Sequence, residues 1–298
     1  MQFARTLILS SAVLAVAACS SDPVSKVVTP DPSAAIRWVN AVPDTVAMDY
    51  RVVDYPSNAS EPALAFGASS GRWRIIPAGS HHVTAFFTNN TAAGDGVSIV
   101  SQVLDDATFN LEANKKYTIL HYGFTKAGAT PQRKLMLIED VVPTVPAGQV
   151  AIRVINAAPA FGAVNVYANL GTATGGAATG TPAFTNVAAG TVSGWVNFPV
   201  ATGTNSYRVT ATAPGSTTAL ADLLAPVGSA AVAATVTTGA LDAVPGTQQA
   251  TSAITIVIFG PRVAYVLHTP TGGTSNVAAT TTTTPATLLD AWPARISP

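Results

Sequence analysis

The sequence contains a single cysteine and few charged residues, and both shortages limit what the protein can be. Of 298 residues only 10% are charged, and 15 Lys and Arg are balanced by 15 Asp and Glu. A nucleic-acid-binding surface needs clustered basic side chains that neutralise phosphates, so this balance argues against that function. A lone cysteine allows no disulfide within the chain and no thiolate metal cluster. The folded part must therefore be stabilised by apolar cores.

Motifs for cofactors and metals are also missing. The chain has no phosphate-binding loop of the G-x-x-x-x-G-K-[ST] or G-x-G-x-x-G type. His81 and His82 are adjacent, so on a strand they point to opposite faces and cannot hold one metal ion together. His121 lies in an apolar run whose later counterpart has Ile258, which favours a packing role. The sequence therefore predicts no cofactor and no metal site.

Two acidic pairs, Asp105-Asp106 and Glu139-Asp140, carry oxygen atoms of the kind that calcium prefers. Neither pair lies in a D-x-D-x-D-G loop, and neighbouring carboxylates on a strand diverge. We therefore expect these residues at solvated strand ends.

The helix-favouring residues Glu, Lys, Gln and Leu are scarce, whereas Ala, Thr, Ser, Gly and Pro are abundant. Short β-type runs separated by turn residues are typical of an antiparallel sandwich. In the first part of the chain the pattern predicts strands at residues 35–40, 48–53, 72–76, 82–88, 97–104, 116–122 and 134–139. Within Arg72-Trp73-Arg74, alternation turns Trp73 inward and leaves both arginines in water.

One segment of the sequence occurs twice. Residues 35–43 and residues 151–159 share Ala, Ile, Arg, Asn, Ala and Pro at the same positions. Such an echo marks a duplicated unit. The sequence therefore predicts an all-β protein with two tandem antiparallel β-sandwich domains of immunoglobulin-like topology, residues 34–143 and 149–298. The short linker 144–148 contains proline and should restrict their relative orientation.

The second unit is longer than the first because of three low-complexity segments, at residues 171–180, 225–250 and 269–285. We expect these segments to form loops or poorly ordered arms. Residues 148–298 also hold only 4 Lys and Arg and 3 Asp and Glu, against 9 and 10 in residues 34–143. Threonine suits the wet face of a strand, but a nearly uncharged surface is also suited to a neutral partner such as a polysaccharide.

The N-terminus predicts export and lipid anchoring. Residues 1–18 contain Arg5 and then an apolar run that is short for a membrane span, as in a secretory signal peptide. Val16-Ala17-Ala18-Cys19 resembles the lipobox of bacterial lipoproteins, in which the cysteine is acylated and becomes the mature N-terminus. Cys19 is therefore the expected lipidation site, and residues 19–33 form a proline-rich tether. Ser20 in place of aspartate resembles sorting to the outer rather than the inner membrane of Gram-negative bacteria.

The first repeat also resembles a known family. Ile36-Arg37-Trp38-Val39-Asn40-Ala41-Val42-Pro43-Asp44, followed by Met48-Asp49-Tyr50, is similar to the opening of the DUF4397 domain. Further similar pieces are Pro77-Ala78-Gly79, Tyr117-Thr118-Ile119 and Leu137-Ile138-Glu139-Asp140. The resemblance covers both repeats. It implies an exported bacterial β-rich module, often present in tandem, for which no biochemical activity is established.

The sequence departs from this family at polar positions. Where the family motif often has histidine, both copies have Asn. Asp44 and Asp49 fit the motif, but the second copy has Ala160 and Asn165. If these carboxylates contact a ligand or cation, only the first domain retains that property. The alternative is that Asp44 caps a turn and Asp49 lies on the wet face of a strand.

Two further motifs suggest specific functions. Gly67-Ala68-Ser69-Ser70-Gly71 matches the G-x-S-x-G elbow of serine hydrolases, which needs a following helix and a nearby histidine. A strand-like pattern follows here instead, which favours a loop of small residues. Exposed tryptophans can stack on sugar rings. Trp38 and Trp73 alternate with Arg in strands, which favours core positions. Trp195 and Trp292 are freer, and Trp195 is the candidate ligand contact. Core packing or a contact between the domains is the favoured alternative for both.

Together these features favour a membrane-anchored, exported protein with a non-enzymatic binding or structural role at the bacterial cell envelope. The expected partners are the membrane, through the lipid, and an envelope protein or polysaccharide. The alternatives are a carbohydrate-binding adhesion module and a serine hydrolase that uses Ser69.

Overall fold

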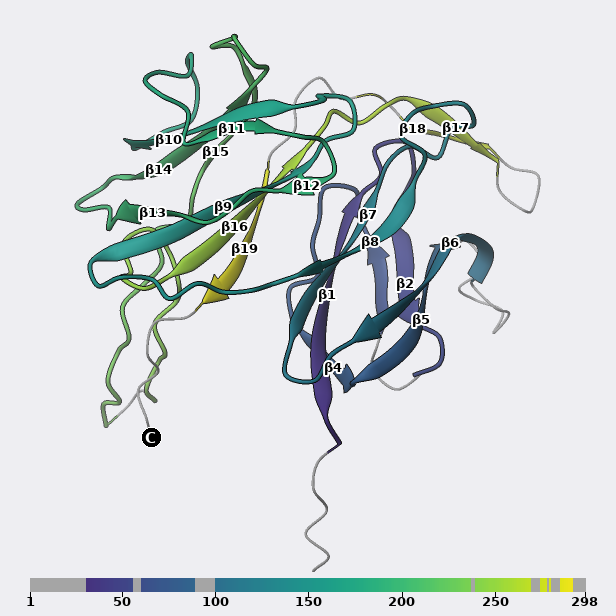
Figure 1. The fold of residues 1–298 in the computed structure, drawn as a ribbon, viewed down its shortest axis with the longest axis horizontal. Coiled ribbons are helices and arrows are strands. Elements are labelled where there is room, and N and C mark those ends of the chain that lie inside the picture. The colour runs from purple at the N-terminus through teal and green to yellow at the C-terminus, as the bar shows by residue number, and fades with distance from the viewer. Residues whose placement is uncertain are drawn as a thin grey trace, which may run out of the picture. The chain divides into compact units, whose positions relative to one another are not determined.

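The computed structural model describes residues 31–55, 60–88, 100–236, 239–268, 274–277, 279 and 285–291. Within these residues every regular element is a β-strand (Figure 1). No helix in this part of the chain is long and apolar enough to cross a membrane. The expected signal peptide and Cys19 lie outside the described residues.

The first half of the structure consists of two four-stranded sheets. One sheet has the order β4-β1-β7-β8, formed by β4 (Arg74–Pro77), β1 (Ser33–Ala41), β7 (Lys116–Tyr122) and β8 (Lys134–Glu139). The other has the order β3-β2-β5-β6, formed by β3 (Ser60–Leu64), β2 (Met48–Val52), β5 (Gly79–Thr88) and β6 (Val100–Leu111).

The second half repeats this arrangement. In one sheet, β9 (Gln149–Ala157) and β16 (Ala253–Phe259) are central, flanked by β12 (Thr191–Val192), β13 (Val196–Pro199) and β19 (Ala286–Ala291). The other has the order β11-β10-β14-β15, formed by β11 (Phe184–Val187), β10 (Val164–Gly171), β14 (Ser206–Thr212) and β15 (Ala219–Leu224). A hairpin of β17 (Tyr265–His268) and β18 (Thr274–Val277) is inserted between β16 and β19. Strands β9, β10, β14 and β16 thus take the places of β1, β2, β5 and β7.

The sheets are antiparallel, as the sequence predicts, except at the centre of each repeat. β1 runs parallel to β7, with Arg37 opposite Thr118, and β9 runs parallel to β16, with Arg153 opposite Thr255. Parallel neighbours need a long crossover connection. The strands of the other sheet supply it, and local sequence patterns carry no information about such distant pairing.

Most strands of the first half begin and end close to their predicted positions, and β7 and β8 match the prediction at every residue. β3 is not predicted, because Ser60–Leu64 contains Pro62 and lacks β-branched residues. The expectation that Trp73 points into the core is wrong. β4 begins only at Arg74, and Trp73 lies in the preceding turn, half-buried on the other side of the sheet.

Each half encloses its own apolar core between two facing sheets, as in a β-sandwich. In the first half, Ile36 and Trp38 of β1 pack in one cluster with Met48 and Tyr50 of β2. Trp38 stacks on Tyr50 with their ring centroids 5.4 Å apart, which confirms the predicted core position of Trp38. The second half has the equivalent cluster, which includes Ile152 and Val154 of β9, Val164 and Val166 of β10, and Ile254 of β16.

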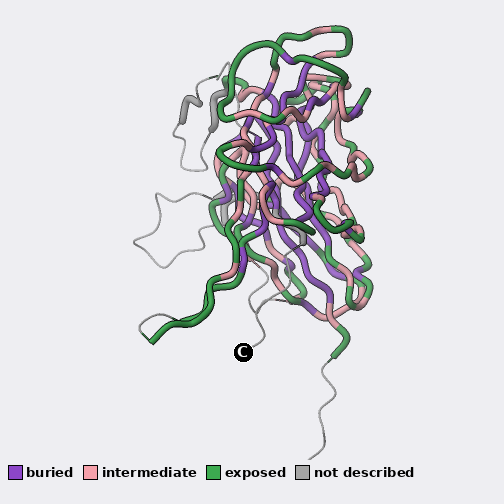
Figure 2. The backbone as a smooth tube through the Cα atoms, turned by 90° about the vertical axis from the view of Figure 1, so that its left-hand side faces the viewer, coloured by how far each residue is buried: buried purple, intermediate pink, exposed green. Residues whose placement is uncertain are grey.

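A third apolar layer lies between the two halves. It contains the residues of β1, β7, β9 and β16 that point away from their own cores, among them Val39, Leu120, Ile155, Val257 and Phe259. These central strands are therefore covered on both faces, which is visible as the buried inner strands of Figure 2. Strands covered on both faces are expected to be apolar at successive positions rather than alternating. This explains why most successive residues of the repeated segment that begins Ala-Ile-Arg are apolar, without the alternation of a half-exposed strand.

Candidate functional site: two arginines that share one aspartate

The repeated segments place two arginines in the layer between the halves. On β1, Ile36 and Trp38 point into the first core, so Arg37 between them points out of it. Arg153 has the same place on β9. Both residues are only 4% exposed. Because a buried guanidinium must be compensated by charge and hydrogen bonds, such burial demands dedicated partners.

The shared partner is Asp140, which directly follows β8. Arg37 donates from Nη2 to Asp140 Oδ2 at 3.2 Å, and Arg153 donates from Nη2 to Asp140 Oδ1. Thr118 Oγ1 also donates to Asp140 Oδ2, at 2.6 Å. The Asp140 side chain has no exposed surface. The expectation of a solvated strand end is therefore wrong for Asp140, because the second half covers it.

The surroundings of the two arginines are also duplicated. Arg37 Nε donates to Thr118 Oγ1 and Arg153 Nε donates to Thr255 Oγ1, each at 2.8 Å. The Arg37 guanidinium lies 4.4 Å from the ring centroid of Trp73, and that of Arg153 lies 4.7 Å from Trp195. Stacking on an indole face adds a cation–π attraction that is strengthened by burial. Each arginine is thus held between a threonine hydroxyl, a tryptophan and the common carboxylate.

Trp195, the candidate ligand contact from the sequence, therefore lies at this cluster. Its indole Nε1 donates to the backbone carbonyl of Val141 at 2.9 Å, one residue beyond Asp140. The ring is half-buried. Its polar edge is bonded to the segment between the halves and its face is covered by Arg153, so both features that could serve a sugar ring are used internally.

A second sequence echo accompanies the tryptophans and was missed in the sequence analysis. Ser70-Gly71-Arg72-Trp73 corresponds to Ser193-Gly194-Trp195. Ser70 Oγ accepts a hydrogen bond from the backbone N–H of Trp38, and Ser193 Oγ accepts one from that of Val154, each at 2.9 Å. Together with the repeated Arg, this echo could have identified both Arg–Trp pairs. Their convergence on Asp140 could not be predicted, because it depends on how the halves pack.

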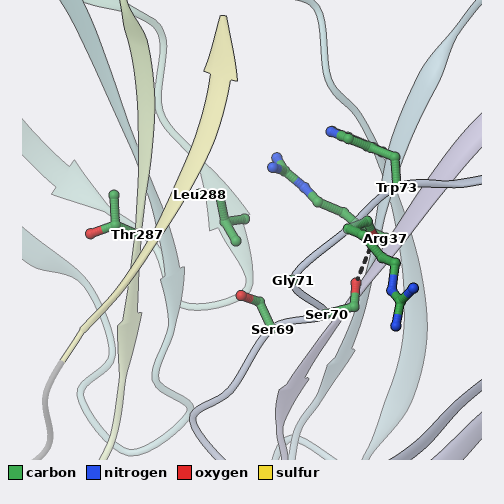
Figure 3. A pocket seen from close by; sticks show the side chains of 8 residues that line it. Arg37, Ser69, Ser70, Gly71, Trp73, Thr287 and Leu288 are labelled. Carbon is green, nitrogen blue, oxygen red and sulfur yellow. Dashed lines mark hydrogen bonds between the residues drawn. The ribbon is translucent and has the colours of Figure 1, made fainter. Parts of the chain in front are cut away.

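A pocket of about 220 Å³ adjoins the cluster (Figure 3). Its lining residues are Arg37, Ser69, Ser70, Gly71, Arg72, Trp73, Thr287 and Leu288. Figure 3 shows Leu288 of β19 facing the loop that carries Ser69. The pocket therefore lies between the loop before β4 and the last strand of the second half.

Ser69 lines this pocket but lacks the surroundings of a hydrolase nucleophile. It forms an isolated bridge with Val39, and the next regular element is strand β4 rather than a helix. Within the described residues it makes no hydrogen bond with a histidine. The neighbouring Ser70 Oγ is bonded to the backbone of Trp38 and, at 3.4 Å, to the carbonyl of Arg72. The loop therefore fastens to the edge of β1.

Asp44, a candidate ligand contact, is 4% exposed and bonded to a loop. Its Oδ1 accepts from the backbone N–H of Thr125 and its Oδ2 from that of Lys126, each at 2.8 Å. Both carboxylate oxygens thus cap the connection from β7 to β8. The second half has Ala160 at the corresponding position and carries the β17–β18 hairpin in this connection.

Asp49, the other candidate, also binds backbone. Its Oδ1 accepts from the N–H of Ala63 at 2.7 Å, and Ala63 has a φ of 51°. In the second half, Asn165 Oδ1 accepts from the N–H of Asn186 at 2.9 Å, and Asn186 has a φ of 49°. The same strained backbone position in an edge strand, β3 or β11, is held by an aspartate in one repeat and an asparagine in the other. The carboxyl charge is therefore not needed for this contact.

The repeated asparagines join the two sheets of each half. Asn40 Nδ2 donates to the carbonyl of Leu64 and Asn156 Nδ2 donates to that of Val187, each at 2.9 Å. The Asn156 amide also donates to the carbonyl of Gly162 at 2.8 Å. Both asparagines are fully buried. Their recurrence in the two segments thus reflects a common structural requirement.

His121 is buried, as its apolar surroundings predict, but it belongs to a polar network. Tyr50 Oη lies 3.1 Å from Nδ1, and Asp105 Oδ2 lies 2.7 Å from Nε2. Burial lowers the pKa of His121, although Asp105 opposes this shift, and burial raises the pKa of Tyr50. Val166 and Ile258 line the equivalent region of the second core. Tyr50 and His121 are fully buried, whereas the Asp105 side chain is 20% exposed.

In the part of the chain that the structure describes, no group of three or more His, Cys, Asp or Glu residues is arranged to hold a metal ion. His81 and His82 point to opposite faces, as predicted. His81 is 8% exposed and bonded to Asp54, whereas the His82 side chain is 46% exposed and bonded to Asp106.

Comparison with known families agrees with the resemblance seen in the first repeat. Residues 34–167 match the family described as a domain of unknown function, DUF4397. The matched segment begins in β1 and ends within β10, so it contains Arg37, Asp140 and Arg153. The segment that matches this family therefore includes the arginine–aspartate cluster. No curated protein matches the chain.

Proposed function

We propose that this protein is an exported, lipid-anchored component of the bacterial cell envelope with a non-enzymatic structural or binding role. Its two halves are two tandem DUF4397-like repeats, each an immunoglobulin-like sandwich, and they act as one rigid body. The observation that carries the proposal is the buried cluster of Arg37, Asp140 and Arg153, which joins the halves. A protein that only needed two independent binding modules would not require it.

The segment between the halves supports a rigid body. Val145 is buried in a small cluster with Ala151 and Ala253, and Trp195 packs against this cluster. Together with the apolar layer, these contacts leave little freedom for a hinge. A fixed distance and orientation between two surfaces suits a spacer or an assembly subunit better than a flexible tether.

Of the two binding alternatives, a protein partner is better supported than a carbohydrate. Every aromatic side chain whose burial the structure describes is buried or half-buried. None of these residues therefore offers a fully exposed ring for stacking on a sugar, and Trp292 lies outside the described residues. The surroundings of Ser69 give the hydrolase alternative no support.

The anchor can be tested at Cys19. Each buried lipid CH₂ contributes about 0.8 kcal/mol, so an acylated Cys19 with several long chains holds the protein on a membrane. We expect the wild type to incorporate labelled palmitate and to sediment with membranes, and Cys19→Ser to do neither. Ser20→Asp is the matched control, since it should keep the lipid and change only the membrane in which the protein resides. Equal membrane association of wild type and Cys19→Ser would exclude the lipid anchor.

The structural role can be tested with the lipid-free chain, residues 33–298, cross-linked to isolated envelopes. A specific protein captured by the wild type and lost with Asp140→Asn would support an assembly subunit that depends on the fixed orientation of its halves. Captured polysaccharide would instead favour the adhesion module. A new product formed from envelope substrates would contradict the non-enzymatic role.

A further inference from the structure

The described part of the alanine-rich segment projects from the second half as a hairpin. We call the described residues 226–236 and 239–246 the apolar arm. Its two strands are joined by isolated bridges, Ser229 to Val244 and Val232 to Leu241. Figure 2 shows the arm leaving the molecule as an exposed segment at the lower left. It agrees with the expectation that this segment forms an arm.

The arm concentrates exposed apolar surface. Of the eleven large apolar side chains that are exposed in the described residues, five belong to it: Val227, Val232, Val236, Leu241 and Val244. Val236 is fully exposed, at 106%. The only ionisable residue among residues 226–246 is Asp242. Apolar surface gathered in this way marks a site that contacts a protein or a membrane.

The base of the arm is firmly held, so the arm is a built feature of the fold. A Cβ atom on Gly246 would lie 2.1 Å from the backbone nitrogen of Gly228, so the two strands cross too closely for any side chain. Gly246 donates from its backbone N–H to Ser252 Oγ at 3.0 Å, and the hydroxyls of Thr247 and Ser206 are 2.6 Å apart.

The direction in which the arm extends indicates what it contacts. In Figures 1 and 2, which differ by a 90° turn about the vertical axis, the arm and the start of β1 both extend toward the lower end. Only residues 20–32 separate Cys19 from β1. A chain of this length spans at most about 45 Å. The chain that leads to Cys19 therefore leaves the described fold at the same end as the arm, and the tether is short enough for a bilayer that holds Cys19 to be reached from that end.

We propose that the apolar arm rests in the headgroup region of the bilayer to which Cys19 anchors the chain, as a second and non-covalent membrane contact. This inference rests on the proposed lipid anchor. The anchor raises the local concentration of the bilayer, so a modest apolar contact with one ionisable residue suffices. Two contacts at one end would hold the rigid pair of halves in a fixed orientation on the membrane.

The test uses the full lipidated chain with Val236→Cys, reconstituted into vesicles of phosphatidylethanolamine and phosphatidylglycerol. Because the lipid occupies the Cys19 thiol, the new cysteine takes an environment-sensitive NBD label alone. Leu170→Cys in β10, where the native side chain is 57% exposed, is the matched control. We expect a blue-shifted emission that is quenched by doxyl-labelled lipid at position 236, and a water-like, unquenched emission at position 170.

Two results would overturn the inference while leaving the anchor intact: an unquenched label at position 236 in protein that is incorporated through its lipid, or equal quenching at both positions. Failure of the wild type to incorporate, with the same behaviour in Cys19→Ser, would remove the anchor and the inference with it. The two failures are thus distinguished by incorporation, measured by flotation before the fluorescence experiment.

Discussion

The strongest prediction concerns Asp140, because one side chain compensates two buried cations. Asp140→Asn keeps the size of the side chain, removes the negative charge, and turns an NH₂ group toward a guanidinium or a hydroxyl donor. The wild-type carboxylate accepts from Arg37, Arg153 and Thr118 without any exposed surface. Removing one member of a buried ion pair costs about 3–5 kcal/mol, since the remaining charges stay desolvated.

A loss of this size is easily measured. Proteins of this length are stable by only about 5–15 kcal/mol, and each kcal/mol shifts the melting temperature by roughly 2–4 °C. We therefore expect Asp140→Asn to lower the melting temperature of residues 33–298 by about 6–20 °C in circular dichroism scans. Because Asp140 joins the halves, the single transition should also separate into two.

The neighbouring variant Glu139→Gln is the control, since Glu139 is exposed and pairs with the surface residue Lys115. It should leave the transition almost unchanged. The double variant Asp140→Asn with Arg153→Met should lose less than the sum of the single losses, because it removes one of the uncompensated cations. A shift for Asp140→Asn no larger than that of Glu139→Gln would refute the role assigned to the cluster.

Three further predictions probe the packing between and within the halves. Gly190→Ala should destabilise the protein more than Gly203→Ala. Both glycines have a positive φ, but only a Cβ at Gly190 would meet the Tyr122 ring, at 3.0 Å. Equal urea midpoints for the two variants would contradict the close packing of Gly190 on Tyr122 between the halves. Burial lowers the pKa of His121 from its ordinary value of 6.5. As the pH drops below 6.5, the unfolded chain takes up a proton at this residue before the folded protein does. The free energy of unfolding should therefore fall, by at most about 1.4 kcal/mol per pH unit. Urea midpoints at pH 5 to 7 should show a smaller loss for His121→Gln, and an identical slope would argue against this assignment. Asn156→Ala should cost about 3 kcal/mol of unfolding free energy, since it leaves the buried carbonyl of Val187 and the buried N–H of Ala158 unpaired. A loss within error of zero would be inconsistent with that network.

The local structure of the first half could largely be predicted from the sequence. Strands such as β7 and β8 follow directly from runs of β-favouring residues bounded by turns, and the repeated segments reveal the duplication. β3 was not predictable, because an edge strand with Pro62 is held by its neighbour β2 rather than by its own propensity. Trp73 was misplaced because alternation is informative only if the strand begins where it is assumed to begin.

The candidate site shows the same limit more sharply. The sequence by itself determined that Arg37 and Arg153 are equivalent, because they occupy one motif in two copies of a β-rich unit. Only the tertiary structure decided that both are buried and that Asp140 serves them together. The physical reason is that the second face of the central strands is covered by the other half of the molecule. Whether a charge faces water or a partner depends on such long-range packing, which no local pattern of residues records.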